Sequence, residues 1–223
     1  MPLTIYAPHD ILKFAKSIQT LRFDRRIREK AQDIFEWVQS HPGAQDDVRN
    51  HGSGNAGTTN MMRTFGYKAG FATFLGDVLK GTLSVLIARW LAPAFGLEAV
   101  HAASAAAIAA MLGHMYPVYF RFQGGKGVAT AFGAVAALHP LILLVLIAVG
   151  LPLILITGYV SLGSMTGAAL YPFILLGTML YRGRIDELSL LLAILLVGII
   201  LGNHRENLRR LREGTENKFY RKK

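Results

Sequence analysis

The chain has 223 residues, of which 52% are hydrophobic and 17% are charged, and it contains no cysteine. Soluble domains usually carry about 25% charged residues, so the apolar excess predicts a protein that crosses a membrane several times. The lack of cysteine excludes disulfides and cysteine-based metal or nucleophile chemistry. The formal net charge is +10, but the cations lie mainly beside the apolar segments. That pattern is typical of cytoplasmic loops and argues against a nucleic-acid-binding groove.

Residues 1–47 differ from the rest of the chain, because basic and apolar residues are interleaved there. An apolar set that includes Ile11 and Ile18 recurs at near-helical spacing, and Lys13 and Lys16 interrupt it, which argues against a cleavable signal peptide. The pattern predicts a basic amphipathic helical segment. Such a segment either lies on an anionic leaflet or packs on the protein's own cytoplasmic face.

Six apolar stretches follow, and they predict an all-α, polytopic helical membrane protein with about six membrane segments. The stretches are 69–91, 99–120, 128–138, 141–156, 160–180 and 188–201. At about 1.5 Å per helical residue the third stretch is too short to cross a bilayer alone, so a short or re-entrant helix is expected there. Gly163 and Gly167 form a small-xxx-small pattern that favours close helix contact. Asp77 and Lys80 are expected to form a pair inside the first stretch.

Basic residues before the first stretch and after the last predict that both ends of the chain face the cytoplasm. With six crossings, three polar motifs between the apolar stretches fall on that same face. The expected parts are the amphipathic segment 1–47, a membrane-embedded domain over 48–217 and a basic cytoplasmic tail over 218–223.

The first polar motif, residues 52–63, combines glycines with hydroxyl and amide side chains. It contains a literal G-x-G-x-x-G, but no strand precedes it, as a dinucleotide site requires. Glycine turns expose consecutive N–H groups that bind anions, and an arginine can bind phosphate bidentately. The alternative is a glycine-rich loop in which Thr59 or Asn60 caps the next helix. The candidate phosphate ligands are Ser53, Asn55, Thr58, Thr59, Asn60 and Arg63.

The second motif is Gly124-Gly125-Lys126-Gly127. It is not a P-loop, because Phe120 and Gly127 stand where that pattern needs glycine and a hydroxyl residue. What remains is a lysine in a flexible loop just before a helix N-terminus, an arrangement that favours phosphate binding. The alternative is a lysine placed by the positive-inside bias alone.

The third motif, residues 203–207, places His204 and Asn207 three residues apart, on one face if the segment is helical. His204 can serve as a general base or as a phosphate donor, and Asn207 can orient it or bind a carbonyl group. An interfacial histidine can also be structural. His101 and His139 lie at the ends of apolar stretches and are assigned no chemistry.

The three motifs, in this order, resemble those of the bacterial acyl-phosphate:glycerol-3-phosphate acyltransferases, the PlsY family. The match runs from about Val48 to Glu216, and it includes Asp77-Val78-Leu79-Lys80-Gly81 and Gly113-His114…Pro117. The resemblance implies transfer of a fatty acyl group from acyl-phosphate to the 1-hydroxyl of sn-glycerol 3-phosphate. The products are lysophosphatidic acid and inorganic phosphate. The implied location is the bacterial plasma (inner) membrane, with the active site facing the cytoplasm.

The resemblance further implies that no cofactor or metal takes part, and that a separate enzyme supplies the acyl-phosphate. By motif position, the catalytic residues would be Ser53, Lys126, His204 and Asn207. The substrate-binding residues would be Arg63, Asn55, Thr59, Asn60, Gly124, Gly125 and Gly127.

Members of that family normally begin with a membrane span that leads into the first motif, and residues 1–47 stand in its place here. A non-enzymatic transporter or lipid-phosphate-binding protein is the alternative class. A transport site is expected near the bilayer midplane, whereas these motifs lie at the ends of apolar stretches.

Overall fold

The computed structural model describes Glu29 and residues 48–219. The predicted amphipathic segment 1–47, apart from Glu29, and the last four residues of the predicted tail lie outside the described residues. The described residues divide into two compact units, the first within the ranges 1–73 and 116–124 and the second within the ranges 74–115 and 125–223.

The first unit holds the short 3-10 helix η2 (Val48–Asn50), helix α3 (Thr58–Phe65), the first turns of α4 (Tyr67–Leu91) and the 3-10 helix η4 (Val118–Phe120). Its small core consists of Val48, Met61 and Ala69. In the second of its two chain segments, Gln123 accepts a hydrogen bond of 2.8 Å from the Arg49 guanidinium, which also lies 5.1 Å from the centre of the Phe120 ring. These contacts tie the 116–124 loop to η2.

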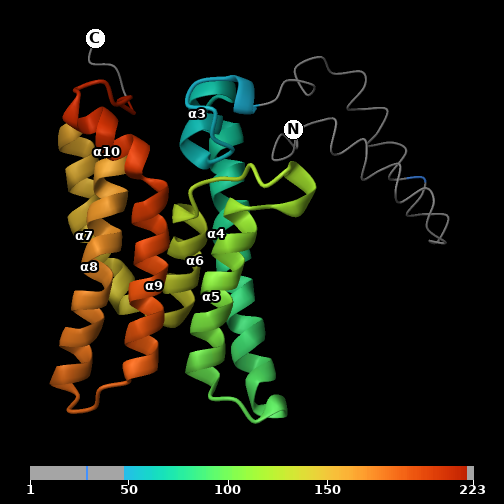
Figure 1. The fold of residues 1–223 in the computed structure, drawn as a ribbon, viewed down its shortest axis with the longest axis vertical. Helices are drawn as coiled ribbons and strands as arrows, with labels where there is room; N and C mark the ends of the chain where they lie inside the picture. The colour runs from blue at the N-terminus through green and yellow to red at the C-terminus, as the bar shows by residue number, and fades with distance from the viewer. Residues whose placement is uncertain (1–28, 30–47, 220–223) are drawn as a thin grey trace. The chain divides into compact units, whose positions relative to one another are not determined.

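The second unit is a bundle of helices (Figure 1). After the remainder of α4 it contains η3 (Ala92–Phe95), α5 (Ala99–Met115), α6 (Val128–Leu138), α7 (Pro140–Thr157), α8 (Val160–Tyr181), α9 (Glu187–Asn203) and α10 (Arg205–Arg212). The described residues form helices and no strands, so the predicted all-α class is confirmed. The six apolar stretches correspond to α4 through α9. The second ends at Met115 instead of Phe120, because Pro117 has no backbone N–H and disfavours helix at the residue before it.

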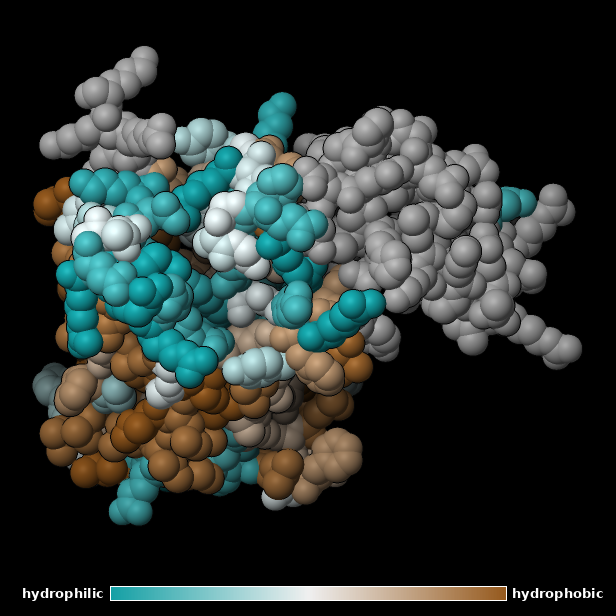
Figure 2. All heavy atoms as spheres, turned by 45° about the horizontal axis from the view of Figure 1, so that its top comes forward, coloured by the Kyte–Doolittle hydropathy of each residue, from teal (hydrophilic) through white to brown (hydrophobic). Residues whose placement is uncertain are grey.

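Three described helices are long and apolar enough to cross a membrane, namely Tyr67–Phe95 with its 3-10 extension, Pro140–Thr157 and Val160–Tyr181. A fourth is obtained if α9 and α10, bent by 53° at their junction, are taken together. α5 and α6 are shorter apolar helices. Figure 2 shows hydrophilic residues gathered over α10 and the adjoining helix ends, with hydrophobic residues along the helix sides below them.

Small residues let helices of the second unit approach closely. A Cβ added to Gly163 of α8 would meet the Gly150 carbonyl oxygen at 2.7 Å and overlap Ile154, both on α7. The predicted close contact is therefore confirmed at Gly163. It is wrong at Gly167, where an added Cβ would have no heavy atom of the described residues within 4 Å, because Gly163 is the glycine that faces Gly150 of α7.

This difference gives a matched test of helix packing. Gly163→Ala is expected to lower the free energy of unfolding by about 1–3 kcal/mol, because the new methyl group must displace α7. Gly167→Ala is expected to leave stability unchanged or raise it slightly, since alanine favours helix. Thermal unfolding of both variants in the same detergent measures the difference. Equal midpoints for the two variants would contradict the close packing of α7 on α8.

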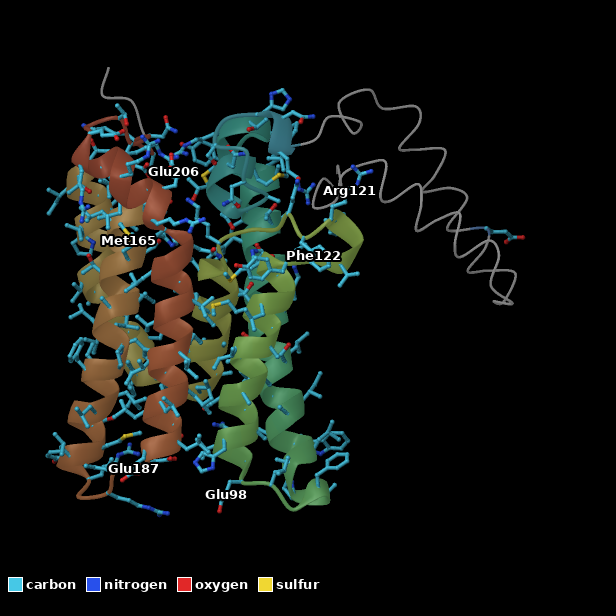
Figure 3. The ribbon with its side chains drawn as sticks, in the orientation of Figure 1. Glu98, Arg121, Phe122, Met165, Glu187 and Glu206 are labelled. Carbon is cyan, nitrogen blue, oxygen red and sulfur yellow. The ribbon has the colours of Figure 1, made fainter. Side chains whose placement is uncertain are left out.

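The end of the bundle opposite α10 carries Glu98 and Glu187 (Figure 3). There the Asp186 carboxylate caps α9 by accepting hydrogen bonds from the Ser189 backbone N–H (3.1 Å) and hydroxyl (2.8 Å). It also accepts a bond of 2.9 Å from His101 Nε2 at the start of α5. His101 is therefore part of a link between two helix ends. Although burial acts to raise it, the bonds from Ser189 and His101 lower the pKa of Asp186 from 3.8 to about 2.

A pH effect follows from this lowered pKa. Because the folded-state pKa lies below the ordinary value, the stabilisation by Asp186 is complete above about pH 4 and is lost as the pH falls toward 2. Asp186→Asn is expected to lower stability at pH 7 by about 1 kcal/mol or less, because the pair is partly exposed. The difference in unfolding midpoint between variant and wild type should shrink below pH 4. A difference that stays constant from pH 7 to pH 3 would contradict the assignment.

Candidate active site

Lys126 stands at the centre of a polar cluster in the second unit. The backbone at Gly127 is left-handed (φ 80°), and α6 begins immediately afterwards at Val128. The predicted arrangement of a lysine directly before a helix N-terminus is therefore confirmed. The Lys126 ammonium donates a hydrogen bond to the side-chain oxygen of Asn207 on α10. The second and third motifs thus meet side chain to side chain.

Asn207 is fixed from its other side by Glu216. The Asn207 amide donates to Glu216 Oε1 at 2.7 Å, and the Ser161 hydroxyl of α8 donates to the same oxygen at 2.6 Å. Arg210 donates to the other oxygen at 2.8 Å. Burial acts to raise the pKa of Glu216, but these three donors outweigh it and lower the pKa below its ordinary value. A charged carboxylate therefore holds the amide so that its oxygen faces Lys126.

His204 occupies the bend between α9 and α10, and its side chain is buried. Its Nδ1 lies 2.8 Å from the Ile200 carbonyl oxygen. A carbonyl only accepts, so Nδ1 carries the proton and donates, and in the neutral ring Nε2 holds the lone pair. Burial lowers the pKa of His204, the bond to Ile200 opposes this, and the Lys126 charge lowers it further. The neutral ring, with Nε2 as an acceptor, is the favoured form at pH 7.

The expected pair of Asp77 and Lys80 is confirmed, with a distance of 3.0 Å between the Lys80 ammonium and Asp77 Oδ1. The same carboxylate oxygen lies 3.2 Å from Nδ1 of His114 on α5. Asp77 is thus a buried carboxylate with two partners, Lys80 on its own helix α4 and His114 on α5.

In the first unit, the first motif is organised by Asn60. Its amide nitrogen donates to the carbonyl oxygens of Val48 (3.0 Å) and His51 (2.9 Å), and its oxygen accepts from the Ser53 N–H at 3.0 Å. Neither Thr59 nor Asn60 caps α3, whose N-cap residue is Gly57. The Ser53 and Gly54 N–H groups are used inside the loop, the latter by the His51 carbonyl at 2.9 Å. The predicted anion nest therefore loses these two donors, because the loop's own acceptors occupy them.

The other polar groups of the first motif differ in their exposure to solvent. Asn55 Oδ1 and Thr58 Oγ1 are buried and have no hydrogen-bond partner among the residues that the structure describes. The Ser53 side chain is exposed, Thr59 is half-buried, and Arg63 lies exposed in the last turn of α3. That this group shares one site with Lys126, His204 and Asn207 stays a prediction.

Ser161, Arg210 and Glu216 were not among the candidate site residues, nor was His114. Glu216 and His114 stand within the stretches that carry the family resemblance, which was the available signal. Ser161 gives no signal in the sequence, because a serine near the start of an apolar helix is commonly a solvated residue.

Comparison with known proteins places the chain in a family. A family model described as glycerol-3-phosphate acyltransferase matches residues 37–214. The chain belongs to the glycerol-3-phosphate acyltransferase family. It is 43% identical over 177 residues to the glycerol-3-phosphate acyltransferase of Clostridioides difficile (strain 630), covering 79% of this chain and 84% of that protein. It is 46% identical over 175 residues to the enzyme of that name from Geotalea daltonii, covering 78% and 85%.

Two similar crystal structures are of PlsY (YgiH), an integral membrane glycerol 3-phosphate acyltransferase. The glycerol 3-phosphate form is 33% identical with a TM-score of 0.70, covering 96% of each chain. The lysophosphatidic acid form is 38% identical with a TM-score of 0.64, covering 74% of this chain and 80% of that one. The resemblance to the PlsY family is confirmed. This family member is accordingly an acyltransferase embedded in a membrane.

Proposed function

We propose that this family member transfers the acyl group of an acyl-phosphate to the 1-hydroxyl of sn-glycerol 3-phosphate at the cytoplasmic face of a bacterial inner membrane. The observation that carries the proposal is the Lys126 ammonium, held by Asn207 in front of the α6 N-terminus and near the neutral His204. Both substrates bear phosphate, and a cation beside helix N–H groups binds phosphate favourably.

In the proposed reaction, the hydroxyl oxygen of glycerol 3-phosphate attacks the acyl carbonyl carbon. The bond between that carbon and the phosphate oxygen breaks, and inorganic phosphate leaves. His204 Nε2 is an acceptor in the neutral ring and can take the hydroxyl proton; the departing phosphate is the competing acceptor. Acyl-phosphate is an activated donor, so alignment of the two substrates supplies much of the rate without a covalent intermediate.

The first motif is proposed to complete the site. Ser53, Asn55, Thr59 and Arg63 would bind phosphate or glycerol oxygens, and Asn60 supports the loop that carries them. In the second motif, Gly124, Gly125 and Gly127 let the backbone approach the phosphate. The buried side-chain oxygens of Asn55 and Thr58 have no partner within the described part of the chain, which supports this assignment, because buried polar atoms ordinarily have one.

The proposed orientation rests on the distribution of charge. Lys126 and the arginines of α10 lie at one end of the second unit, and Glu206 marks that end in Figure 3. Cytoplasmic segments are enriched in Lys and Arg, which supports a cytoplasmic position for this end. A midplane transport site is disfavoured, because the Lys126–Asn207–Glu216 cluster lies at the ends of the helices.

The test is phosphate release by the purified protein in detergent, given a long-chain acyl-phosphate with and without glycerol 3-phosphate. Release that requires glycerol 3-phosphate and yields lysophosphatidic acid is expected, with no reaction when acyl-CoA is the donor. Turnover with acyl-CoA alone would overturn the donor assignment. Activity in sealed inside-out vesicles, compared with right-side-out ones, tests the cytoplasmic orientation.

A further inference from the structure

The buried Asp77 carboxylate has more partners than an isolated ion pair needs. Its side chain is 3% exposed, and its Oδ1 lies 3.0 Å from Lys80 Nζ and 3.2 Å from His114 Nδ1. Lys80 belongs to the same helix, whereas His114 belongs to the last turn of α5. A charge within a membrane segment is costly and is retained where it has a specific role.

The other side of the His114 ring faces the glycine loop. A Cβ added to Gly125 would overlap the His114 Nε2 and Cε1 atoms. The Gly125 N–H also donates to the His114 carbonyl oxygen at 3.3 Å. Gly127 is packed in the same way, since a Cβ there would collide with Met111 and Met115 on either side of His114 along α5. The last turn of α5 is therefore the surface on which the loop rests.

A continuous series of contacts leads from this surface to the polar cluster. Asp77 orients the His114 ring, Gly125 lies against the ring, and Lys126 follows Gly125 and bonds to Asn207. We propose that Asp77 and His114 are positioning residues, which hold the Gly125–Gly127 segment so that the Lys126 ammonium points at the phosphate of the substrate. Gly125 must be glycine because the oriented imidazole fills the space that a side chain would need. This inference rests on the proposed phosphate-binding role of Lys126.

The first experiment compares the activity of single and double variants of the full chain. Gly125→Ala is expected to lower kcat/KM by about 10–100-fold, because a displacement of about 1 Å in a positioning group costs that much. In the double variant His114→Ala with Gly125→Ala, the new methyl group enters the vacated space, so activity should rise above that of Gly125→Ala alone. Gly113→Ala is the matched control on α5, since a Cβ there meets no atom of the described residues within 4 Å, and it should stay near wild type.

The second experiment separates positioning from a merely structural role. His114→Asn keeps an N–H donor near the Nδ1 position toward Asp77, so it should retain more activity than His114→Ala. The loss in His114→Ala and Asp77→Asn should fall mainly on KM for the phosphate substrates. Lower unfolding midpoints with unchanged KM and kcat would overturn the proposal. So would a double variant no more active than Gly125→Ala.

A binding measurement keeps the inference testable if acyl-phosphate proves not to be the donor. The shift in unfolding midpoint caused by glycerol 3-phosphate should be smaller in His114→Ala and Asp77→Asn than in wild type, and near wild type in Gly113→Ala. A normal shift in the first two variants would overturn the positioning role without bearing on the donor. A wild-type shift without turnover would instead count against the proposed donor alone.

Discussion

Replacement of Lys126 by alanine is expected to lower kcat/KM by about 10²–10³-fold, the loss typical for removal of one preorganised charge-stabilising group. The ammonium is fixed by Asn207, which Glu216 fixes in turn, so no other cation is held in the same geometry within the described part of this cluster. Initial rates of glycerol-3-phosphate-dependent phosphate release, with each substrate varied in turn, measure the effect.

Two controls define what the loss means. Arg212→Ala removes the same charge from an exposed position on α10 and should change kcat/KM by no more than about twofold, because exposed charges are screened. Lys126→Arg keeps the charge but changes its geometry, so it should recover only part of the activity. A loss in Arg212→Ala as large as that in Lys126→Ala would mean that the overall positive field matters, and not the placement of Lys126.

His204→Ala, assayed beside Lys126→Ala, distinguishes the two roles of the histidine. If Nε2 takes the hydroxyl proton, His204→Ala loses far more turnover than Lys126→Ala, and kcat falls at low pH. Because burial and Lys126 lower the pKa of His204, that fall begins below the ordinary histidine range, and activity persists as long as the ring is neutral. Comparable losses in the two variants, confined to substrate affinity, would indicate phosphate binding instead.

Replacement of Glu216 by alanine is expected to cost about 3–5 kcal/mol of unfolding free energy, because three donors lose a buried acceptor. The side chain is 5% exposed and connects Ser161 of α8 with Asn207 and Arg210 of α10. At about 2–4 °C per kcal/mol, the unfolding midpoint should fall by about 10 °C. Activity should fall as well, since Asn207 is then free to turn away from Lys126.

Glu213→Ala is the matched control for Glu216. Glu213 is 47% exposed and pairs with Arg209 at 3.0 Å one turn away, so its removal should cost about 0.5 kcal/mol or less. The stabilisation by Glu216 depends on pH, and the direction of this dependence follows from the pKa of its side chain. Because the pKa of Glu216 is lowered in the folded state, its stabilisation is present at neutral pH and is lost as the pH falls through that lowered value. Equal midpoints for Glu213→Ala and Glu216→Ala would contradict this network.

The sequence predicted the helices well because apolar runs of membrane length are a strong signal. The bounds of α6 agree with the prediction residue for residue, since Gly127 and Pro140 limit it on both sides. The end of α5 was predicted too late, because the apolar run continues past the point where Pro117 stops the helix. The apolar run ends at residue 201, close to the end of α9 at Asn203, but hydropathy does not show that the chain bends by 53° there and continues as α10.

The site was predictable where its residues stand in the three polar motifs and not where they act through partners. Lys126, His204 and Asn207 were identified from residue type and spacing, and the structure brings Lys126 and Asn207 into contact. Ser161 was missed because its role depends on Glu216, 55 residues away. The function of Asn60 as the centre of a loop likewise depends on three backbone groups that no local pattern reveals.

The shortness of α6 has a consequence for how the protein responds to its bilayer. At 1.5 Å per residue, α6 is about 16 Å long, roughly half of a hydrocarbon core of about 30 Å. The longer helices α4, α7 and α8 must tilt when the lipid chains around them lengthen or shorten. α6 is too short to reach both interfaces, so hydrophobic mismatch acts on it through the helices that it contacts, chiefly α5 and α7. We therefore expect the depth of Lys126 to follow the tilt of those neighbouring helices.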